Sequence, residues 1–235
     1  MTIKGTLFGV GVGPGDPELL TLRAWRLISS CDVIAYPQSA EGDSLARRIC
    51  APFIPEEATE LAITVPMTSD RKPAMDAYDA AALKIASHLN ENRHVVFLCA
   101  GDPFFYGSFM YLFERMAANY KTVIIPGVTS LTAAAAGIAR PLAARNDVLK
   151  VLPAPLEAER LKTEIQSADA IAIIKVGKHF DKVRGVIRDL GLEANATIIE
   201  AASREDEKVT ALADVAGGER PYFSTILIYK GAEPW

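Results

Sequence analysis

The hydrophobic pattern of the chain alternates between short apolar runs and longer segments in which apolar residues recur three or four positions apart. Residues 95–99 are apolar throughout, which is typical of a strand buried on both faces of a sheet. Residues 73–90 instead place Ala81, Ile85 and Leu89 on one face of a helix. The pattern therefore predicts strands and helices that follow one another in turn.

In the first half of the chain the two kinds of segment alternate regularly. The expected strands are residues 6–12, 31–36, 58–65, 95–99 and 122–125. The expected helices are residues 21–29, 44–50, 73–90 and 108–118. Because parallel neighbouring strands need a crossover that is usually helical, this order predicts a largely parallel sheet covered by helices.

The second half resumes the alternation after a break at Pro126-Gly127 and opens with an expected helix at residues 131–139. Strands are expected at residues 147–153, 168–175, 196–201 and 222–229, and helices at 157–167 and 181–190. Residues 208–215 show a mixed pattern. We therefore predict an α/β fold made of two α/β domains, residues 1–125 and residues 126–235.

The strand at residues 95–99 ends in a turn built from Gly101, Asp102 and Pro103. The carboxyl ends of strands are where open α/β sheets bind small molecules. Asp102 is therefore either a carboxylate that faces a ligand or a turn residue that bonds its own backbone. The turn chemistry alone favours the second alternative.

A glycine-rich loop follows the first strand, with Gly11, Gly13 and Gly15 around Pro14. The dinucleotide fingerprint Gly-x-Gly-x-x-Gly fails, because its last position holds Pro14 or Asp16, and no P-loop sequence occurs. The glycines either let the backbone approach a bulky ligand closely or form a tight strand-to-helix turn. Thr129 and Ser130 pose a similar choice, since their hydroxyls either cap the next helix or face a ligand.

Composition and charge narrow the class of protein. Half of the 235 residues are apolar, 23% are charged and the formal net charge is −4, which argues weakly against nucleic acid as the main partner. No apolar run reaches the length that crosses a bilayer. The chain begins without the pattern of a secretory signal, so we expect a cytoplasmic protein. Its three cysteines and three histidines are not clustered, so we expect no protein-bound metal.

Four motifs, taken in their order and spacing, resemble the tetrapyrrole methylase family over essentially the whole chain. They are Gly-Val-Gly-Pro-Gly-Asp-Pro-Glu-Leu-Leu-Thr at 11–21, Asp-Val-Ile-Ala-Tyr-Pro at 32–37, Gly-Asp-Pro-Phe-Phe-Tyr-Gly-Ser at 101–108 and Pro-Gly-Val-Thr-Ser at 126–130. Together with Ile-Lys-Val-Gly at 174–177 and Tyr-Phe-Ser-Thr-Ile-Leu-Ile at 222–228, they are most similar to members that methylate carbon 20 of precorrin-2.

The resemblance implies a homodimer of two-domain chains with S-adenosylmethionine bound in the cleft between the domains. By matching motifs, it implies cofactor contacts, mostly through the backbone, from Pro14, Ala100, Gly101, Asp102, Phe105, Tyr106, Thr129, Ser130, Val176 and Ala202. It also places Tyr222, Asp102 and Lys175 beside the substrate. Tyr222 is then the expected partner in proton transfer, and Asp102 and Lys175 orient the macrocycle. Judged from the residues alone, Tyr222 is equally a half-buried strand aromatic and Lys175 a solvated lysine.

The implied substrate is a tetrapyrrole with eight carboxylates. Gly13 and Asp16 are expected near it, and Arg140, Arg145 and Arg204 are candidates to pair with its carboxylates. Each of these arginines taken singly is more typical of a solvated surface residue. Alternative functions are a sister enzyme acting on another ring carbon, a member that modifies protein or RNA, and a catalytically silent ligand-binding module. The sequence leaves open whether the ring is metal-free or carries cobalt.

Overall fold

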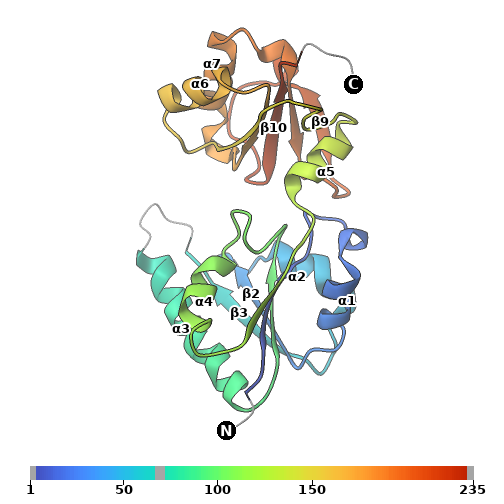
Figure 1. Cartoon of the computed structure of the whole chain (residues 1–235), viewed down its shortest axis with the longest axis vertical. Helices are drawn as coiled ribbons and strands as arrows, with labels where there is room; N and C mark the ends of the chain where they lie inside the picture. Colours follow the sequence, from blue (N-terminus) through green and yellow to red (C-terminus); the bar gives the residue numbers. More distant parts are fainter. Residues whose placement is uncertain (1–3, 67–71, 232–235) are drawn as a thin grey trace. The chain divides into compact units, whose positions relative to one another are not determined.

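A computed structural model describes residues 4–66 and 72–231, and its contacts divide the chain into two compact units (Figure 1). Residues up to Thr129 belong to the first unit, and residues from Ser130 onward belong to the second. The expectation of a cytoplasmic location rests partly on residues 1–3, which lie outside the described residues. None of the described helices is both long and apolar enough to span a bilayer.

The first unit is built on a five-stranded, wholly parallel sheet in the order β3-β2-β4-β1-β5. This confirms the parallel sheet that the regular alternation of strands and helices predicted. Its strands are β1 (Leu7–Gly11), β2 (Val33–Gln38), β3 (Thr59–Thr64), β4 (Val95–Cys99) and β5 (Thr122–Ile125).

Helices cover both faces of the first sheet. The helices are α1 (Leu22–Ile28), α2 (Leu45–Cys50), α3 (Lys72–Asn90) and α4 (Phe109–Met116), with short 3-10 turns at Pro17–Leu19 and Ala51–Phe53. Helices α3 and α4 lie on one face and α1 and α2 on the other (Figure 1). Ala81, Ile85 and Leu89 of α3 are buried, as its helical periodicity predicted.

The sequence predicted the end of β2 too early. We expected Pro37 to close this strand, whereas β2 continues through Pro37 to Gln38 beside β3. The pairing of β2 with β4 stops at Ala35. Beyond that residue one side of β2 has no partner strand, so a residue without an amide hydrogen is tolerated there.

The second unit is built on a mixed five-stranded sheet in the order β6-β7-β10-β8-β9. Strands β6 and β7 are parallel, while β10 is antiparallel to both β7 and β8, and β9 is antiparallel to β8. The strands are β6 (Leu149–Pro153), β7 (Ala170–Ile174), β8 (Ala196–Glu200), β9 (Lys208–Ala211) and β10 (Ser224–Tyr229).

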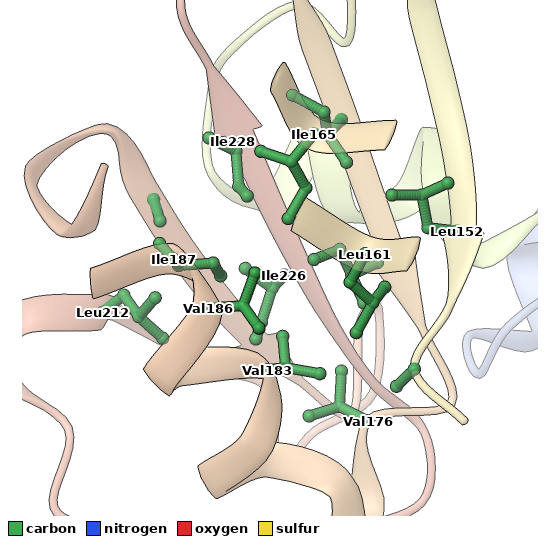
Figure 2. Packing of buried hydrophobic residues seen from close by; sticks show 14 of the residues in the cluster. Leu152, Leu161, Ile165, Val176, Val183, Val186, Ile187, Leu212, Ile226 and Ile228 are labelled. Carbon is green, nitrogen blue, oxygen red and sulfur yellow. The ribbon is translucent and has the colours of Figure 1, made fainter. Parts of the chain in front are cut away.

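Three helices complete the second unit, namely α5 (Ser130–Gly137), α6 (Ala158–Gln166) and α7 (Phe180–Asp189), with 3-10 turns at Gly177–His179, Glu193–Asn195 and Leu212–Asp214. Helices α6 and α7 pack on one face of the sheet, where Leu161, Ile165 and Val183 interdigitate with strand residues such as Ile226 (Figure 2). Helix α5 contacts β10 and contributes no residue to this cluster. Both units are therefore α/β, which confirms the predicted fold class.

Candidate functional site

Three loops meet at the carboxyl edge of the first sheet. Strand β1 lies between β4 and β5, and all three run parallel. The segments that follow them, residues 12–16, 100–108 and 126–129, therefore leave the sheet side by side. We refer to these segments as the three-loop cluster, and they hold most of the residues that the sequence assigned to the cofactor.

The three-loop cluster is held together by backbone groups. The amide of Gly101 donates to the carbonyl of Gly13 at 2.7 Å, and the amide of Val12 donates to the carbonyl of Cys99 at 2.9 Å. A Cβ atom on Gly127 would lie 2.2 Å from the carbonyl oxygen of Gly101, and one on Gly11 would lie 2.6 Å from the amide nitrogen of Gly127. Side chains at these two positions are therefore excluded by the neighbouring backbone.

The carboxylate of Asp102 fastens two of these loops to each other. Its Oδ1 atom accepts hydrogen bonds from the amides of Phe104 at 2.9 Å and Phe105 at 3.1 Å. Its Oδ2 atom accepts from the amide of Gly127, in the loop after β5, at 3.0 Å. Hydrogen bonds to a charged acceptor are stronger than those between neutral groups. Asp102 is thus a turn residue that also bridges two loops, and its predicted contact with a ligand stays a prediction.

Aromatic side chains line the loop after β4. Phe104 is 47% exposed and Tyr106 is 42% exposed, and the rings of Phe105 and Tyr106 meet edge to face at 5.2 Å. Tyr106 adopts a left-handed backbone conformation with φ of 55°, which is strained for a residue with a side chain. The loop thus presents aromatic surface beside the backbone groups of Ala100 and Gly101.

The remaining residues predicted at the carboxyl edge of the first sheet lie in the loop after β1 and at the beginning of α5. Gly13 has φ of +79°, and Pro14 follows it. Asp16 Oδ1 accepts a hydrogen bond from the amide of Glu18 at 2.8 Å and so caps the turn Pro17–Leu19. Thr129 and Ser130 stand at the beginning of α5.

The second sheet brings another set of predicted residues to one of its edges. Strands β7 and β8 are both antiparallel to β10, so both end at the edge where β10 begins, and Glu200, the last residue of β8, pairs with Ser224. Lys175 and Val176 follow β7, Ala202 lies just beyond β8, and Tyr222 precedes β10. We call this the Tyr222 edge. Lys175, Ala201 and Ser203 there have φ of 58°, 53° and 64°, so this edge also contains strained backbone.

Tyr222 lies in a turn and not in the predicted strand. The strand β10 begins at Ser224, because both the amide and the hydroxyl of Ser224 donate to the carbonyl of Pro221, at 3.1 and 2.7 Å. The Tyr222 side chain is 43% exposed and contacts the ring of Phe223 edge to face at 5.2 Å. Tyr222 is therefore partly exposed to solvent, unlike a strand residue that faces the core.

Val176 and Ala202 differ from Tyr222 because little of either residue is accessible. Val176 is fully buried and its side chain lies in the core near Val183 (Figure 2), and Ala202 is 5% exposed. Neither side chain projects from the surface, so the cofactor contacts predicted for Val176 and Ala202 stay predictions.

The three candidate arginines are separated in the second unit. Arg204 lies at the Tyr222 edge, where its amide donates to the carbonyl of Ala201 and its side chain pairs with Asp206 at 2.8 Å. Arg140 lies over the ring of Tyr229, 4.5 Å from its centroid. Tyr229 pairs with Ala170 at the opposite end of β7 from Lys175.

Arg145 also lies away from the Tyr222 edge. It belongs to the turn before β6, whose first residue Leu149 pairs with Ala170. Five residues of strand separate the two edges by roughly 16 Å. The sequence placed Arg140 and Arg145 with the other substrate residues because they follow α5, but the connection from α5 to β6 enters the opposite edge of the second sheet.

Two buried titratable groups beneath the three-loop cluster stay neutral. Burial raises the pKa of the Cys99 thiol at the end of β4 well above its ordinary value of 9.0. Burial also raises the pKa of the Tyr78 hydroxyl on α3. A thiol in this state is a poor nucleophile. In the part of the chain that the structure describes, no three His, Cys, Asp or Glu side chains are grouped so as to hold a metal ion.

The sequence pattern of the Tetrapyrrole (Corrin/Porphyrin) Methylases matches residues 6–216. The chain belongs to this family. A curated relative from Sinorhizobium, named precorrin-2 C(20)-methyltransferase, is 34% identical over 95% of this chain and 95% of its own length. One from Salmonella typhimurium, named cobalt-precorrin-2 C(20)-methyltransferase, is 28% identical over 97% of this chain and 98% of that protein.

A longer relative is the cobalamin biosynthesis protein CobIJ of Mycobacterium bovis, 39% identical over 98% of this chain but only 47% of that protein. The chain thus spans about half of CobIJ.

Two solved structures share the fold. A cobalt precorrin-4 methyltransferase has a TM-score of 0.76 at 24% identity, covering 97% of this chain and 96% of the other. A Thermus thermophilus uroporphyrin-III C-methyltransferase, solved with S-adenyl homocysteine, has a TM-score of 0.69 at 24% identity, covering 95% and 97%.

Sequence reasoning missed two residues that shape the Tyr222 edge. Arg220 donates hydrogen bonds to two carbonyls of its own loop, and Asp181 accepts one from the amide of Gly218. In the sequence, only the position of Arg220 two residues before Tyr222 pointed to a role at this edge. A solvated surface arginine would give the same signal.

Proposed function

We propose that the chain is an S-adenosylmethionine-dependent methyltransferase that methylates carbon 20 of precorrin-2 to give precorrin-3A in cobalamin biosynthesis. The observation that carries this proposal is the full-length likeness to the Sinorhizobium precorrin-2 C(20)-methyltransferase, at 34% identity. Membership of the tetrapyrrole methylase family supports the broader reaction class. The activity and substrate come to this chain from its relatives, so both require a direct test.

We propose that the three-loop cluster suits the methyl donor because it combines closely packed backbone with exposed aromatic side chains. Neighbouring backbone excludes side chains at Gly11 and Gly127, which keeps the loops in close contact. We propose that the donor is held by Pro14, Ala100, Gly101, Asp102, Phe105, Tyr106, Thr129 and Ser130, together with Val176 and Ala202. When bound, the donor supplies an electrophilic methyl group on a positively charged sulfur.

The chain's main contribution to this reaction is alignment. The departing sulfur becomes neutral, so it needs little help from an acid. Holding the accepting carbon in line with the methyl group can supply on the order of 7–11 kcal/mol. We propose that the hydroxyl of Tyr222, a residue that is 43% exposed, exchanges a proton with the ring. We propose that Lys175 and Asp102 orient the macrocycle, and that Gly13, Asp16 and Arg204 lie near it.

The decisive experiment incubates the purified protein with S-adenosylmethionine carrying a 13C-labelled methyl group and with precorrin-2. We expect mass spectrometry to show the addition of one methyl group. The 13C NMR signal of the labelled methyl group should show that it is attached to carbon 20. Omission of the ring and omission of the donor are the controls. Methylation at another ring carbon, or none at all, would contradict the proposal.

A cobalt-containing ring is the second candidate substrate, because the Salmonella typhimurium relative is named for cobalt-precorrin-2. The same incubation with cobalt-precorrin-2 compares the two rings directly. We favour the metal-free ring because the more similar full-length relative, from Sinorhizobium, is named for precorrin-2. Faster turnover of the cobalt form would reverse this preference.

The role of Tyr222 is tested by Tyr222→Phe, which removes only the hydroxyl. We expect kcat to fall by about 100-fold or more, because general acid–base groups contribute roughly 100- to 10,000-fold. Binding of S-adenosylhomocysteine, measured by isothermal titration, should stay within about twofold, since the change removes no backbone donor. Wild-type turnover in this variant would remove Tyr222 from the proton transfer.

Further features of the proposal concern assembly and location. We propose that the protein acts as a homodimer in the cytoplasm and takes a small tetrapyrrole, not nucleic acid or membrane, as its partner. The acidic balance, with a net charge of −4, supports a partner other than nucleic acid. Sedimentation at several protein concentrations would test the dimer.

A further inference from the structure

Tyr222 belongs to a loop, residues 216–223, that approaches β10 along the end of β7. We call it the Tyr222 loop. We propose that Arg220 is the positioning residue that holds this loop, and through it the Tyr222 hydroxyl, beside the segment after β7. The inference rests on the proposed role of Tyr222 in proton transfer and adds a residue that the family motifs did not point to.

The guanidinium group of Arg220 bonds the loop from within. Its Nη2 atom donates to the carbonyl of Ala216 at 2.6 Å and to the carbonyl of Gly217 at 3.2 Å. The guanidinium also lies over the ring of Phe180, 5.0 Å from its centroid. Phe180 is fully buried in the core of the second unit. Arg220 therefore ties the beginning of the Tyr222 loop to a fixed point in the core.

The backbone of Arg220 makes the second attachment. Its amide donates to the carbonyl of Gly177 at 3.2 Å. A Cβ atom placed on Gly177 would lie 3.7 Å from the Cα atom of Tyr222, so the two backbones pass in contact. Gly177 stands two residues after Lys175, and Arg220 thus brings Tyr222 next to the segment that carries Lys175 and Val176.

The Tyr222 side chain itself is not fixed by burial. It is 43% exposed, and its neighbour Phe223, which its ring contacts, is 47% exposed. The position of the hydroxyl therefore depends on the backbone of the loop. The amide of Gly218 donates to Asp181 at 2.9 Å, and the turn from Pro221 to Ser224 is closed by two further hydrogen bonds.

An arginine suits this position better than a lysine. The planar guanidinium donates to two carbonyls and stacks on a ring at the same time, whereas an ammonium group is a strongly hydrated point charge. We therefore expect Arg220→Met to release the loop and Arg220→Lys to hold it only in part. Arg188→Met is the matched control, because Arg188 lies in the last turn of α7 and pairs with Glu193 on the surface.

The first measurement is amide hydrogen exchange over residues 217–224 in the absence of any ligand. In Arg220→Met we expect exchange in this segment to accelerate on the order of tenfold, with an intermediate effect in Arg220→Lys. Residues of α6 should keep their wild-type protection, which shows that the second unit remains folded. Unchanged exchange in the Tyr222 loop would overturn the inference.

The second measurement is a double-mutant cycle with Tyr222→Phe. Alone, Arg220→Met should lower kcat by about 10- to 100-fold with the KM for the methyl donor unchanged, because a small displacement of a catalytic group costs this much. In the Tyr222→Phe background the same change should lower kcat by less than about twofold. A full additional loss in that background would show that Arg220 does not act through Tyr222.

The two measurements separate failure of this inference from failure of the proposed function. Hydrogen exchange uses no substrate, so it decides the positioning role even if the wild-type protein does not methylate precorrin-2. Absence of methyl transfer by the wild-type protein overturns the proposed function and, with it, the catalytic half of the inference. Arg188→Met should leave both exchange and turnover at wild-type values.

Discussion

The loop-bearing edges of the two sheets are built in different ways. In the first unit, backbone contacts backbone at Gly11, Gly101 and Gly127, and the Asp102 carboxylate joins two of the loops. At the Tyr222 edge of the second unit, the side chains of Arg220 and Asp181 hold the loop. The edge of the first sheet therefore has little tolerance for added atoms at Gly11 and Gly127, and we expect the Tyr222 edge to tolerate the loss of a side-chain contact better.

This difference leads us to expect different roles for the two edges. Loops that pack backbone against backbone, as at Gly11 and Gly127, have a fixed shape. A surface that projects side chains such as Tyr222 and Lys175 can vary its chemistry without changing the backbone. We therefore expect substitutions at the first edge to alter stability and donor binding, and those at the second to alter turnover.

The largest effect on stability is expected for Gly127→Ala. Its Cβ atom would lie 2.2 Å from the carbonyl oxygen of Gly101, so the loops must move apart. We expect the free energy of unfolding to fall by about 3 kcal/mol, at the upper end of overpacking effects. Binding of S-adenosylhomocysteine should weaken at least tenfold. Urea denaturation and isothermal titration measure the two quantities.

The matched control for this prediction is Gly185→Ala in α7 of the second unit. A Cβ atom there meets nothing within 4 Å, and the residue has helical backbone. The same added atom should therefore stabilise the protein by about 0.5–1 kcal/mol. If Gly127→Ala binds S-adenosylhomocysteine and unfolds like the wild-type protein, the loops at the edge of the first sheet are not rigid in the way described.

A smaller effect is expected for Asp102→Asn. The asparagine oxygen can still accept from the amides of Phe104 and Phe105, but its NH2 group would face the amide of Gly127 as a second donor. Leaving that amide without an acceptor should cost about 1–3 kcal/mol. Asp181→Asn in the second unit keeps its single acceptor oxygen toward Gly218, and should cost less than Asp102→Asn. Equal losses in the two variants would contradict the bridging role of Asp102.

Much of the fold could be predicted because burial leaves a local pattern in the sequence. The strands at residues 95–99 and 122–125 match β4 and β5 at both ends, since a polar residue precedes each run and Gly101 or Pro126 follows it closely. The start of β10 was predicted two residues too early. Tyr222 and Phe223 continue the apolar run, but the hydroxyl of Ser224 closes a turn on Pro221, and periodicity does not record such a bond.

The candidate site was predictable in its loops and much less so in its charged residues. The glycine and proline residues in the loops after β1, β4 and β5 predict the turns directly. The contacts of an arginine cannot be predicted in this way, because its long side chain can reach groups that are far away in the sequence. Arg220 stacks on Phe180, while Arg140 stacks on Tyr229 at the opposite edge of the second sheet from Tyr222. Sequence alone gave these two arginines no distinct environments.

The smallest effect is expected for ion pairs that lie outside the loop-bearing edges of the two sheets. In the first unit, Arg47 donates two hydrogen bonds to Glu60, at 3.1 and 3.0 Å, and this holds the pKa of the Glu60 carboxyl below its ordinary value of 4.5. The native state therefore favours the ionised form. This stabilisation is present above about pH 4.5 and is lost as the pH falls through the lowered value.

We expect Glu60→Gln to lower the free energy of unfolding at pH 7 by roughly 0.2–1 kcal/mol, because both partners are partly exposed to solvent. The variant should lose less stability than the wild-type protein when the pH is lowered below 4.5, as urea titrations at several pH values would measure. Glu193→Gln, which removes the acceptor of Arg184 and Arg188 in the second unit, should change the pH dependence in the same direction. Neither variant should alter ligand binding or turnover, since neither carboxylate belongs to the loop-bearing edges. A change in either property would show that these ion pairs are coupled to the loops.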